Sequence, residues 1–177
     1  MTYNSGIVGT SLHHTRLLKG ELRFRKAICY HESGHAVIAS QKGKIYGVAV
    51  VVEAGCGVTR YDLPDLTNKD RIKLCLAGCM AEAIYLKTSF NKRLRNGKKD
   101  LEVAYKLAKE EYHNKNCFLK DKYSKADDML AEAIREIKKD LLHCWPAVRS
   151  VSNALFHHAV LNGDDINKRI LESRKFC

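Results

Sequence analysis

Residues 25–40 read RKAICYHESGHAVIAS, and this stretch decides how the rest of the chain is interpreted. Apolar residues and two histidines recur in it at three- and four-residue spacing, which predicts a helix over about residues 21–41. Inside this helix lies an HExxH segment. Side chains four residues apart lie on one helix face, so His31 and His35 can bind one metal ion while Glu32 activates a water molecule beside it.

The flanking sequence predicts a mainly α (α+β) fold. Short β-rich runs at residues 46–52 and 57–61 predict a hairpin or a pair of sheet strands after the first helix. Thr67 and Asp70 resemble a capping box that begins a second helix, which ends near Lys87. A third helix is expected with Asp100 in its first turn, before an apolar stripe at 101–108. Further helices are expected over 124–143, over 146–161, and over 166–173 after a break at 163–165.

The chain of 177 residues is 45% apolar and has only two prolines and eleven glycines, which favours one helix-rich domain. We expect this domain over residues 21–177, preceded by a loosely ordered N-terminal arm over residues 1–20. No apolar stretch approaches the roughly 20 residues that span a bilayer, and the first residues lack a secretion signal. The seven cysteines form no CxxC pair, which favours reduced thiols in a cytoplasmic protein.

The charge is strongly basic, with 31 Lys and Arg against 20 Asp and Glu, or +11. Residues 87–125 hold twelve basic and five acidic residues, a local surplus of +7. A solvated surface is the favoured interpretation, because no RNP, zinc-finger or helix-turn-helix signature accompanies the charge. Nucleic-acid binding through this basic region is the alternative.

A catalytic zinc ion takes three protein ligands and leaves one position for water, so the HExxH segment needs a third ligand. The extended metzincin pattern would require glycine and histidine where this chain has Ile38 and Gln41, which excludes that class. The carboxylates to consider are Glu53, Glu82 and Asp100. Periodicity alone does not choose among them.

Four segments, in order, resemble the peptidase domain of the FtsH-type ATP-dependent zinc proteases. They are RKAICYHESGHAVIAS, CGVTRYDLPD, LAGCMAEAIYL and NGKKDLEVAYKLA. The family has, in the same order, a HEAGHA helix, a G-x-T strand, a GGRAAEE helix and an ND-[IL]-x-x-A-x-x-[IL]-A helix. The segment 147–170 is similar to the family's last two helices, so the likeness covers about residues 25–172.

The resemblance implies a helical zincin-type peptidase domain with a small β-sheet or hairpin between the first two main helices. It implies one Zn²⁺ per chain, held by His31, His35 and Asp100, with Glu32 as the general base. Glu82 is expected beside the ligands as a supporting or structural residue. Cys79 stands where the family usually has Arg, and we interpret Cys75 and Cys79 as small apolar core residues.

The same resemblance implies a substrate site at a strand edge, formed by Gly57, Val58 and Thr59. An extended substrate binds such an edge through backbone hydrogen bonds, which tolerate many sequences. We therefore expect a zinc endopeptidase that cleaves unfolded or flexible proteins.

The chain has no GxxxxGK[ST] phosphate loop, so it does not unfold substrates with its own ATPase, and an ATPase acting in trans is one option for a partner. A homo-oligomer is another, because the family forms hexameric rings. The alternatives are a non-catalytic FtsH-peptidase-like protein, a nucleic-acid-binding module, and a zinc hydrolase with a substrate other than peptides.

Overall fold

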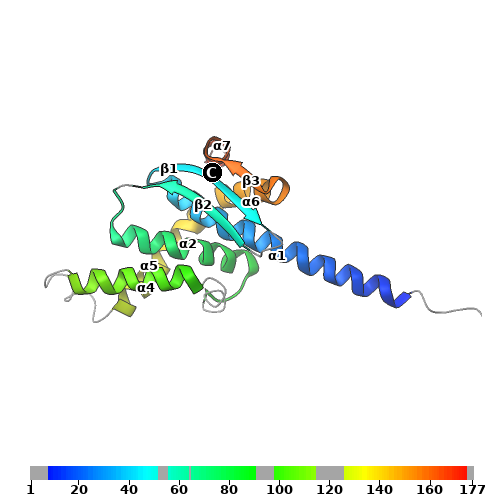
Figure 1. The fold of residues 1–177 in the computed structure, drawn as a ribbon, viewed down its shortest axis with the longest axis horizontal. Coiled ribbons are helices and arrows are strands. Elements are labelled where there is room, and N and C mark those ends of the chain that lie inside the picture. The colour runs from blue at the N-terminus through cyan, green and yellow to red at the C-terminus, as the bar shows by residue number, and fades with distance from the viewer. Residues whose placement is uncertain (1–7, 52–55, 64, 91–97, 115–125, 175–177) are drawn as a thin grey trace, which may run out of the picture.

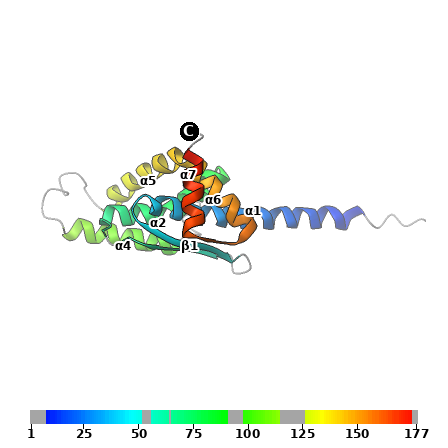
Figure 2. The same ribbon diagram turned by 90° about the horizontal axis from the view of Figure 1, so that it is seen from above.

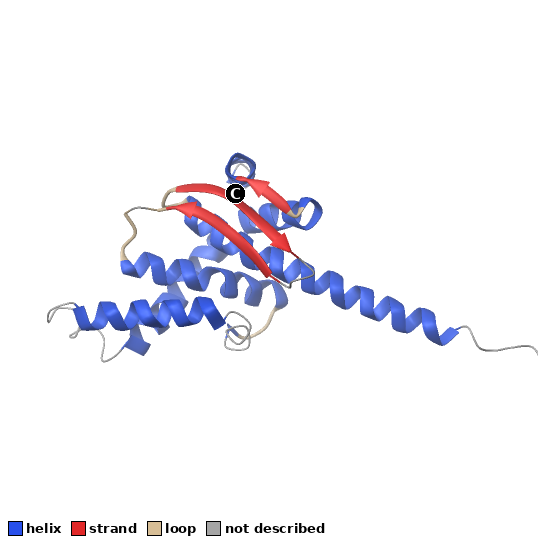
Figure 3. Ribbon diagram, viewed as in Figure 1, coloured by secondary structure: helices blue, strands red, loops and turns tan. Residues whose placement is uncertain are grey.

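The computed structural model describes residues 8–51, 56–63, 65–90, 98–114 and 126–174. The elements in chain order are α1 (Val8–Ser40), β1 (Lys44–Val51), β2 (Cys56–Asp62), α2 (Asn68–Leu86), α4 (Lys98–Asn114), α5 (Ala126–His143), α6 (Trp145–His158), β3 (Val160–Asn162) and α7 (Gly163–Arg174). Helices dominate and the strands form one small antiparallel sheet (Figure 3), so the predicted mainly α (α+β) class is confirmed.

Helices α1 and α2 cross at very close range in the centre of the molecule. A Cβ atom added at Gly34 of α1 would lie 2.6 Å from the carbonyl oxygen of Ala77 and 2.7 Å from the Cβ of Ala81 on α2. Only glycine and alanine at these positions allow this approach. The HExxH segment is therefore held against the backbone of α2, with α4 packed on the other side of α2 (Figures 1 and 2).

The sheet has the order β2-β1-β3 and lies over α1 (Figure 1). β1 pairs with β2 from Lys44↔Asp62 to Val51↔Cys56, with a register irregularity between Ile45 and Gly47. Val48 of β1 and Leu161 of β3 are buried beneath the sheet. Among the described residues, β2 is an edge strand of this sheet, and it lies beside the part of α1 that carries the HExxH segment.

The boundaries of the second and third predicted helices agree with the structure. Thr67 caps α2 by accepting a hydrogen bond from the backbone N–H of Asp70 at 3.1 Å. Lys87 ends the same helix in the left-handed region at φ 53°. Asp100 lies in the first turn of α4, where a carboxylate suits the positive end of the helix dipole.

The N-terminal arm differs from the prediction. α1 begins at Val8, so the predicted arm over residues 1–20 is helical from Val8 onward, and residues 1–7 lie outside the described part. This helical extension projects beyond the rest of the molecule in both views (Figures 1 and 2). A single glycine at position 20 costs a helix only about 1 kcal/mol relative to alanine, too little to end it. Among the described residues, no helix is both long and apolar enough to cross a membrane.

The C-terminal region also corrects two boundaries. The helix predicted over 146–161 ends at His158, and Val160–Asn162 form strand β3 against β1. The break predicted at 163–165 is instead the first turn of α7, where the side chain of Asn162 accepts the backbone N–H of Asp165 at 2.8 Å. A three-residue strand has no periodicity of its own and depends on its pairing with β1.

Candidate metal centre

Three potential ligand atoms from two distant parts of the chain converge in the structure. The Nε2 atom of His31 lies 3.2 Å from the Nε2 atom of His35 and 3.2 Å from Oδ2 of Asp100. Nε2 of His35 lies 3.7 Å from the same carboxylate oxygen. The two histidines come from one face of α1, whereas Asp100 comes from the start of α4, 69 residues beyond His31 in the sequence.

The separations match those of a metal site. A tetrahedral zinc ion with bonds of about 2.05 Å to nitrogen and oxygen holds its ligand atoms about 3.4 Å apart. The three observed separations, 3.2, 3.2 and 3.7 Å, lie around this value. Two imidazoles and one carboxylate are also a common ligand set of catalytic zinc. The donor set therefore fits Zn²⁺.

The far nitrogen of each imidazole has its own acceptor. Nδ1 of His35 lies 2.9 Å from the carbonyl oxygen of Leu74, which can only accept, so this Nδ1 carries a proton. Nδ1 of His31 lies 3.5 Å from Oε2 of Glu82. In their neutral forms both rings then direct an Nε2 lone pair toward the same point as Asp100. This arrangement of acceptor atoms fits a bound cation, and the contacts behind the ligands are those that typically orient metal-binding histidines.

The pKa values of His31 and Asp100 are both shifted by the contacts within the cluster. Burial acts to lower the pKa of His31, but hydrogen bonds to Asp100 and Glu82 raise this pKa to about 9. Burial acts to raise the pKa of Asp100, yet hydrogen bonds with His31 and His35 hold this pKa well below its usual range. A proton on Nε2 of His31 satisfies part of the cluster. A divalent cation at the same point would satisfy all three ligand atoms together.

Glu32 is fixed beside the two histidines by β2. The residue is only 6% exposed, and the hydroxyl of Thr59 donates a hydrogen bond of 2.8 Å to its Oε2 atom. Gly57 lies against the same side chain, since a Cβ atom there would be 2.7 Å from Cδ and Oε1 of Glu32. Val58 points to the opposite face of the sheet and is 51% exposed. Two of the three residues predicted to bind substrate thus contact Glu32.

Gly78 of α2 leaves the space that the imidazoles occupy. A Cβ atom at this position would lie 2.6 Å from both Cδ2 and Nε2 of His31, and closer still to Nε2 of His35. Real Cβ atoms essentially never approach another atom so closely. Gly78 belongs to the LAGCMAEAIYL segment that carries part of the family resemblance, and the structure gives it a steric role at the candidate metal centre.

Cys79 is the residue whose surroundings the sequence did not reveal. It is fully buried, as predicted, but its Sγ atom belongs to a second possible ligand group with His31 and Asp100, whose ligand atoms lie within 4.8 Å of one another. The ligand atoms of His31, His35 and Asp100 lie 3.2–3.7 Å apart, so we regard these three residues as the primary set. Burial, followed by the nearby Asp100 and Glu82 carboxylates, raises the pKa of the Cys79 thiol to about 12. A signal was present in the sequence, because Cys79 and Glu82 share one face of α2 at three-residue spacing.

One predicted ligand candidate and part of the basic region fall outside the described residues. Glu53, the first carboxylate considered as a ligand, falls outside the described residues, as do stretches 91–97 and 115–125 of the basic region. The described part of that region includes α4, which carries both signs of charge, and Lys106 pairs with Glu110 at 3.8 Å.

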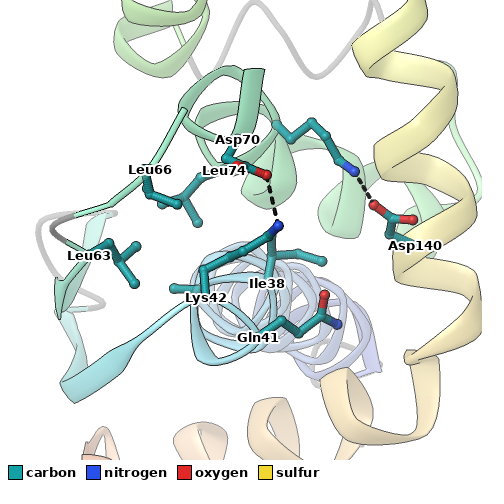
Figure 4. Close-up of a pocket in the computed structure, with 10 residues that line it drawn as sticks. Ile38, Gln41, Lys42, Leu63, Leu66, Asp70, Leu74 and Asp140 are labelled. Atoms are coloured by element: carbon teal, nitrogen blue, oxygen red, sulfur yellow. Dashed lines mark ion pairs between the residues drawn. The ribbon is translucent and has the colours of Figure 1, made fainter. Parts of the chain in front are cut away.

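A hollow on another part of the surface contains none of the candidate ligands. It lies where the end of α1, the start of α2 and α5 meet (Figure 4). Two ion pairs line it, Lys42 with Asp70 at 2.9 Å and Lys73 with Asp140 at 2.5 Å. Each carboxylate there has a lysine partner from the chain itself, so the hollow is a packed junction of three elements rather than part of the candidate metal centre.

Comparison with models of known protein families gave no match, and comparison with curated proteins gave no significant relative.

Proposed function

We propose that the chain is a zinc-dependent endopeptidase related to the FtsH-type peptidase domain. The observation that carries the proposal is the convergence of His31 Nε2, His35 Nε2 and Asp100 Oδ2 at 3.2–3.7 Å, with Glu32 beside them. These four residues match, position by position, the ligands and general base that the family resemblance implies.

Each residue has a defined task in this proposal. His31, His35 and Asp100 would hold the zinc ion, which when bound polarises the scissile carbonyl and lowers the pKa of water. Glu32 takes a proton from the attacking water and delivers it to the leaving amine. The hydroxyl of Thr59, 2.8 Å from Oε2 of Glu32, orients the carboxylate and leaves its other oxygen for this transfer.

The edge of β2 favours an extended polypeptide as the substrate. Gly57 and Thr59 bring this strand against Glu32, and the strand has an unpaired side among the described residues. An extended substrate added there pairs with the backbone of β2 and runs past the general base. Because folded proteins do not offer such a segment, we expect cleavage of unfolded or flexible chains.

The decisive experiment measures cleavage of a casein-like unfolded protein without nucleotide. We expect the zinc-loaded wild type to cleave, and a chelator or the variant Glu32→Gln to abolish cleavage while Glu32→Gln keeps its zinc. Glu111→Gln is the matched control, because Glu111 is also a buried glutamate but lies on α4 with Asn68 as its partner at 2.8 Å. This variant is expected to remain active.

Two outcomes would contradict the proposal. One is a wild-type preparation with one zinc per chain that cleaves neither unfolded proteins nor peptides, with or without an added unfolding ATPase. The other is steeply salt-dependent binding of RNA or DNA that zinc removal leaves unchanged, which would favour a nucleic-acid-binding module.

A further inference from the structure

We propose that Cys79 is a fourth ligand supplied by the chain, and that its thiolate holds the metal ion in a closed state from which water is excluded. The inference rests on the metal centre of the proposed function but not on peptidase activity. It concerns a residue that stands where the resembled family usually has arginine. Among the described residues, it is the cysteine whose sulfur belongs to a possible ligand group.

The position of Cys79 makes ligation feasible. Its side chain is 0% exposed, and its Sγ atom lies within 4.8 Å of the ligand atoms of His31 and Asp100. It follows Gly78, whose missing side chain brings the backbone of α2 against both imidazoles. The thiol is therefore a buried ligand candidate close to the metal position, whereas the Asp100 side chain is partly exposed to solvent.

The distances allow two arrangements. In a tetrahedral site with a zinc–sulfur bond of about 2.3 Å and zinc–nitrogen bonds of about 2.05 Å, sulfur and nitrogen lie about 3.6 Å apart. Sγ of Cys79 lies at most 4.8 Å from the ligand atoms of His31 and Asp100, which exceeds the ideal separation by little more than 1 Å. Rotation about χ1, the torsion that positions Sγ in cysteine, covers a shift of this size. The ion can then have either three protein ligands and an open position, or four and none.

The two states differ by one proton and one water molecule. In the closing step the Cys79 thiol releases its proton to solvent, a metal–sulfur bond forms and the water at the fourth position leaves. In the opening step that bond breaks, water returns and the sulfur takes a proton back. No oxidant or reductant takes part. Zinc sites with four protein ligands are closed and structural, whereas catalytic sites keep an open position, so the closed state is inactive.

Cobalt binding to the full chain tests the inference directly. Co²⁺ replaces Zn²⁺ in such sites, and a cobalt–thiolate bond gives an intense charge-transfer absorption in the near ultraviolet. We expect this band in the wild type at one Co²⁺ per chain, and its complete loss in Cys79→Ser with the d–d bands retained. Cys75→Ser is the matched control, because Cys75 lies one helical turn earlier on α2 outside the ligand group and should keep the band.

The possible results separate this inference from the proposed function. A wild type that binds one Co²⁺ without the band, or a band that survives in Cys79→Ser, overturns the role of Cys79. If Cys79→Ser fails to fold, Cys79→Ala provides the same readout. A cysteine-dependent band in a protein that cleaves nothing supports the fourth ligand and contradicts the peptidase. If both proposals hold, zinc-loaded Cys79→Ser cleaves unfolded protein faster than the wild type.

Discussion

Two polar clusters lie along the same pair of helices, α1 and α2, yet they are built on opposite principles. In the surface hollow, Asp70 and Asp140 each meet a lysine, at 2.9 and 2.5 Å. In the candidate metal centre, the Asp100 carboxylate and two imidazole nitrogens converge instead on one another. The hollow carries its own lysine cations, whereas the centre has a ligand set that fits a metal ion.

This difference also explains how the two regions are packed. The hollow uses long side chains that reach across gaps between α1, α2 and α5. The centre uses the smallest residues, Gly34 and Gly78, which bring backbones within reach of short, rigid imidazoles. Lysine pairs tolerate movement because their chains are flexible, but ligand atoms held near 3.4 Å do not. We therefore expect substitutions in the two regions to have effects of different kinds.

Removal of the carboxylate ligand should have the largest effect. In Asp100→Ala we expect zinc affinity to fall by more than about 100-fold, because changes behind the ligands alone cost 10–100-fold. At a free zinc concentration of about 100 times the wild-type Kd, the variant also loses about 2.3 to 2.7 kcal/mol of metal-dependent stability. Equilibrium zinc titration and unfolding with and without chelator measure both.

The control for this prediction comes from the hollow. Asp140→Ala removes one of the two carboxylate partners of Lys73 but should leave zinc affinity unchanged and cost at most about 1 kcal/mol. Equal losses of zinc affinity in the two variants would mean that the clusters are not the separate units described above.

Gly78→Ala should have the next largest effect. The added methyl would lie 2.6 Å from Nε2 of His31, so α1 and α2 must separate or the imidazoles must turn away. We expect weaker zinc binding and a loss of about 1–3 kcal/mol in the free energy of unfolding. Gly20→Ala is the matched control, because nothing lies within 4 Å of its added Cβ, and it should stabilise the helix by about 1 kcal/mol. Unchanged zinc binding in Gly78→Ala would contradict the close approach of α2.

Glu82→Gln tests the support behind His31. The carboxylate lies 3.5 Å from Nδ1 of that ring and favours the tautomer that directs Nε2 toward the metal. We expect a 10–100-fold loss of zinc affinity, measured by competition with a chromophoric chelator. The buried Glu111→Gln should bind zinc like the wild type. Zinc affinity in Glu82→Gln equal to that of the wild type would mean that Glu82 contributes to packing and does not orient His31.

The features that are predicted most accurately from the sequence are those that depend on the spacing of neighbouring residues. The HExxH helix, the N-cap at Thr67 and the place of Asp100 in a first turn follow from helix geometry, and the structure contains all three. The pairing of Asp100 with His31 spans 69 positions, so periodicity left three carboxylates open and only the family resemblance selected this one. Local rules do not specify such a distance in sequence.

What the sequence missed depends on how elements approach one another. Strand β3 exists because three residues after α6 pair with β1. Cys79 is predicted as an ordinary apolar helix residue, and its position near two ligands follows from the close approach of α2 to the imidazoles that Gly78 permits. Both misses concern the relative placement of elements, which hydrophobic patterns constrain only loosely.

The smallest predicted effect concerns the hollow and its dependence on pH. Partial burial acts to raise the pKa of Asp70, but the Lys42 ammonium and the Thr67 hydroxyl hold this pKa below its ordinary value. A lowered folded-state pKa contributes stability above the unfolded pKa of about 3.9, and this contribution is lost as pH falls through the folded value. Because half of the Lys42 side chain is exposed, we expect Asp70→Asn to cost at most about 1 kcal/mol at pH 7. Urea unfolding of both proteins from pH 7 downward should show this difference shrinking below pH 4, since the wild-type carboxyl then becomes neutral as well. A difference independent of pH would assign the role of Asp70 to hydrogen bonding at the helix cap rather than to its charge. In that case the hollow would no longer contrast with the metal centre as a cluster that its own lysines neutralise.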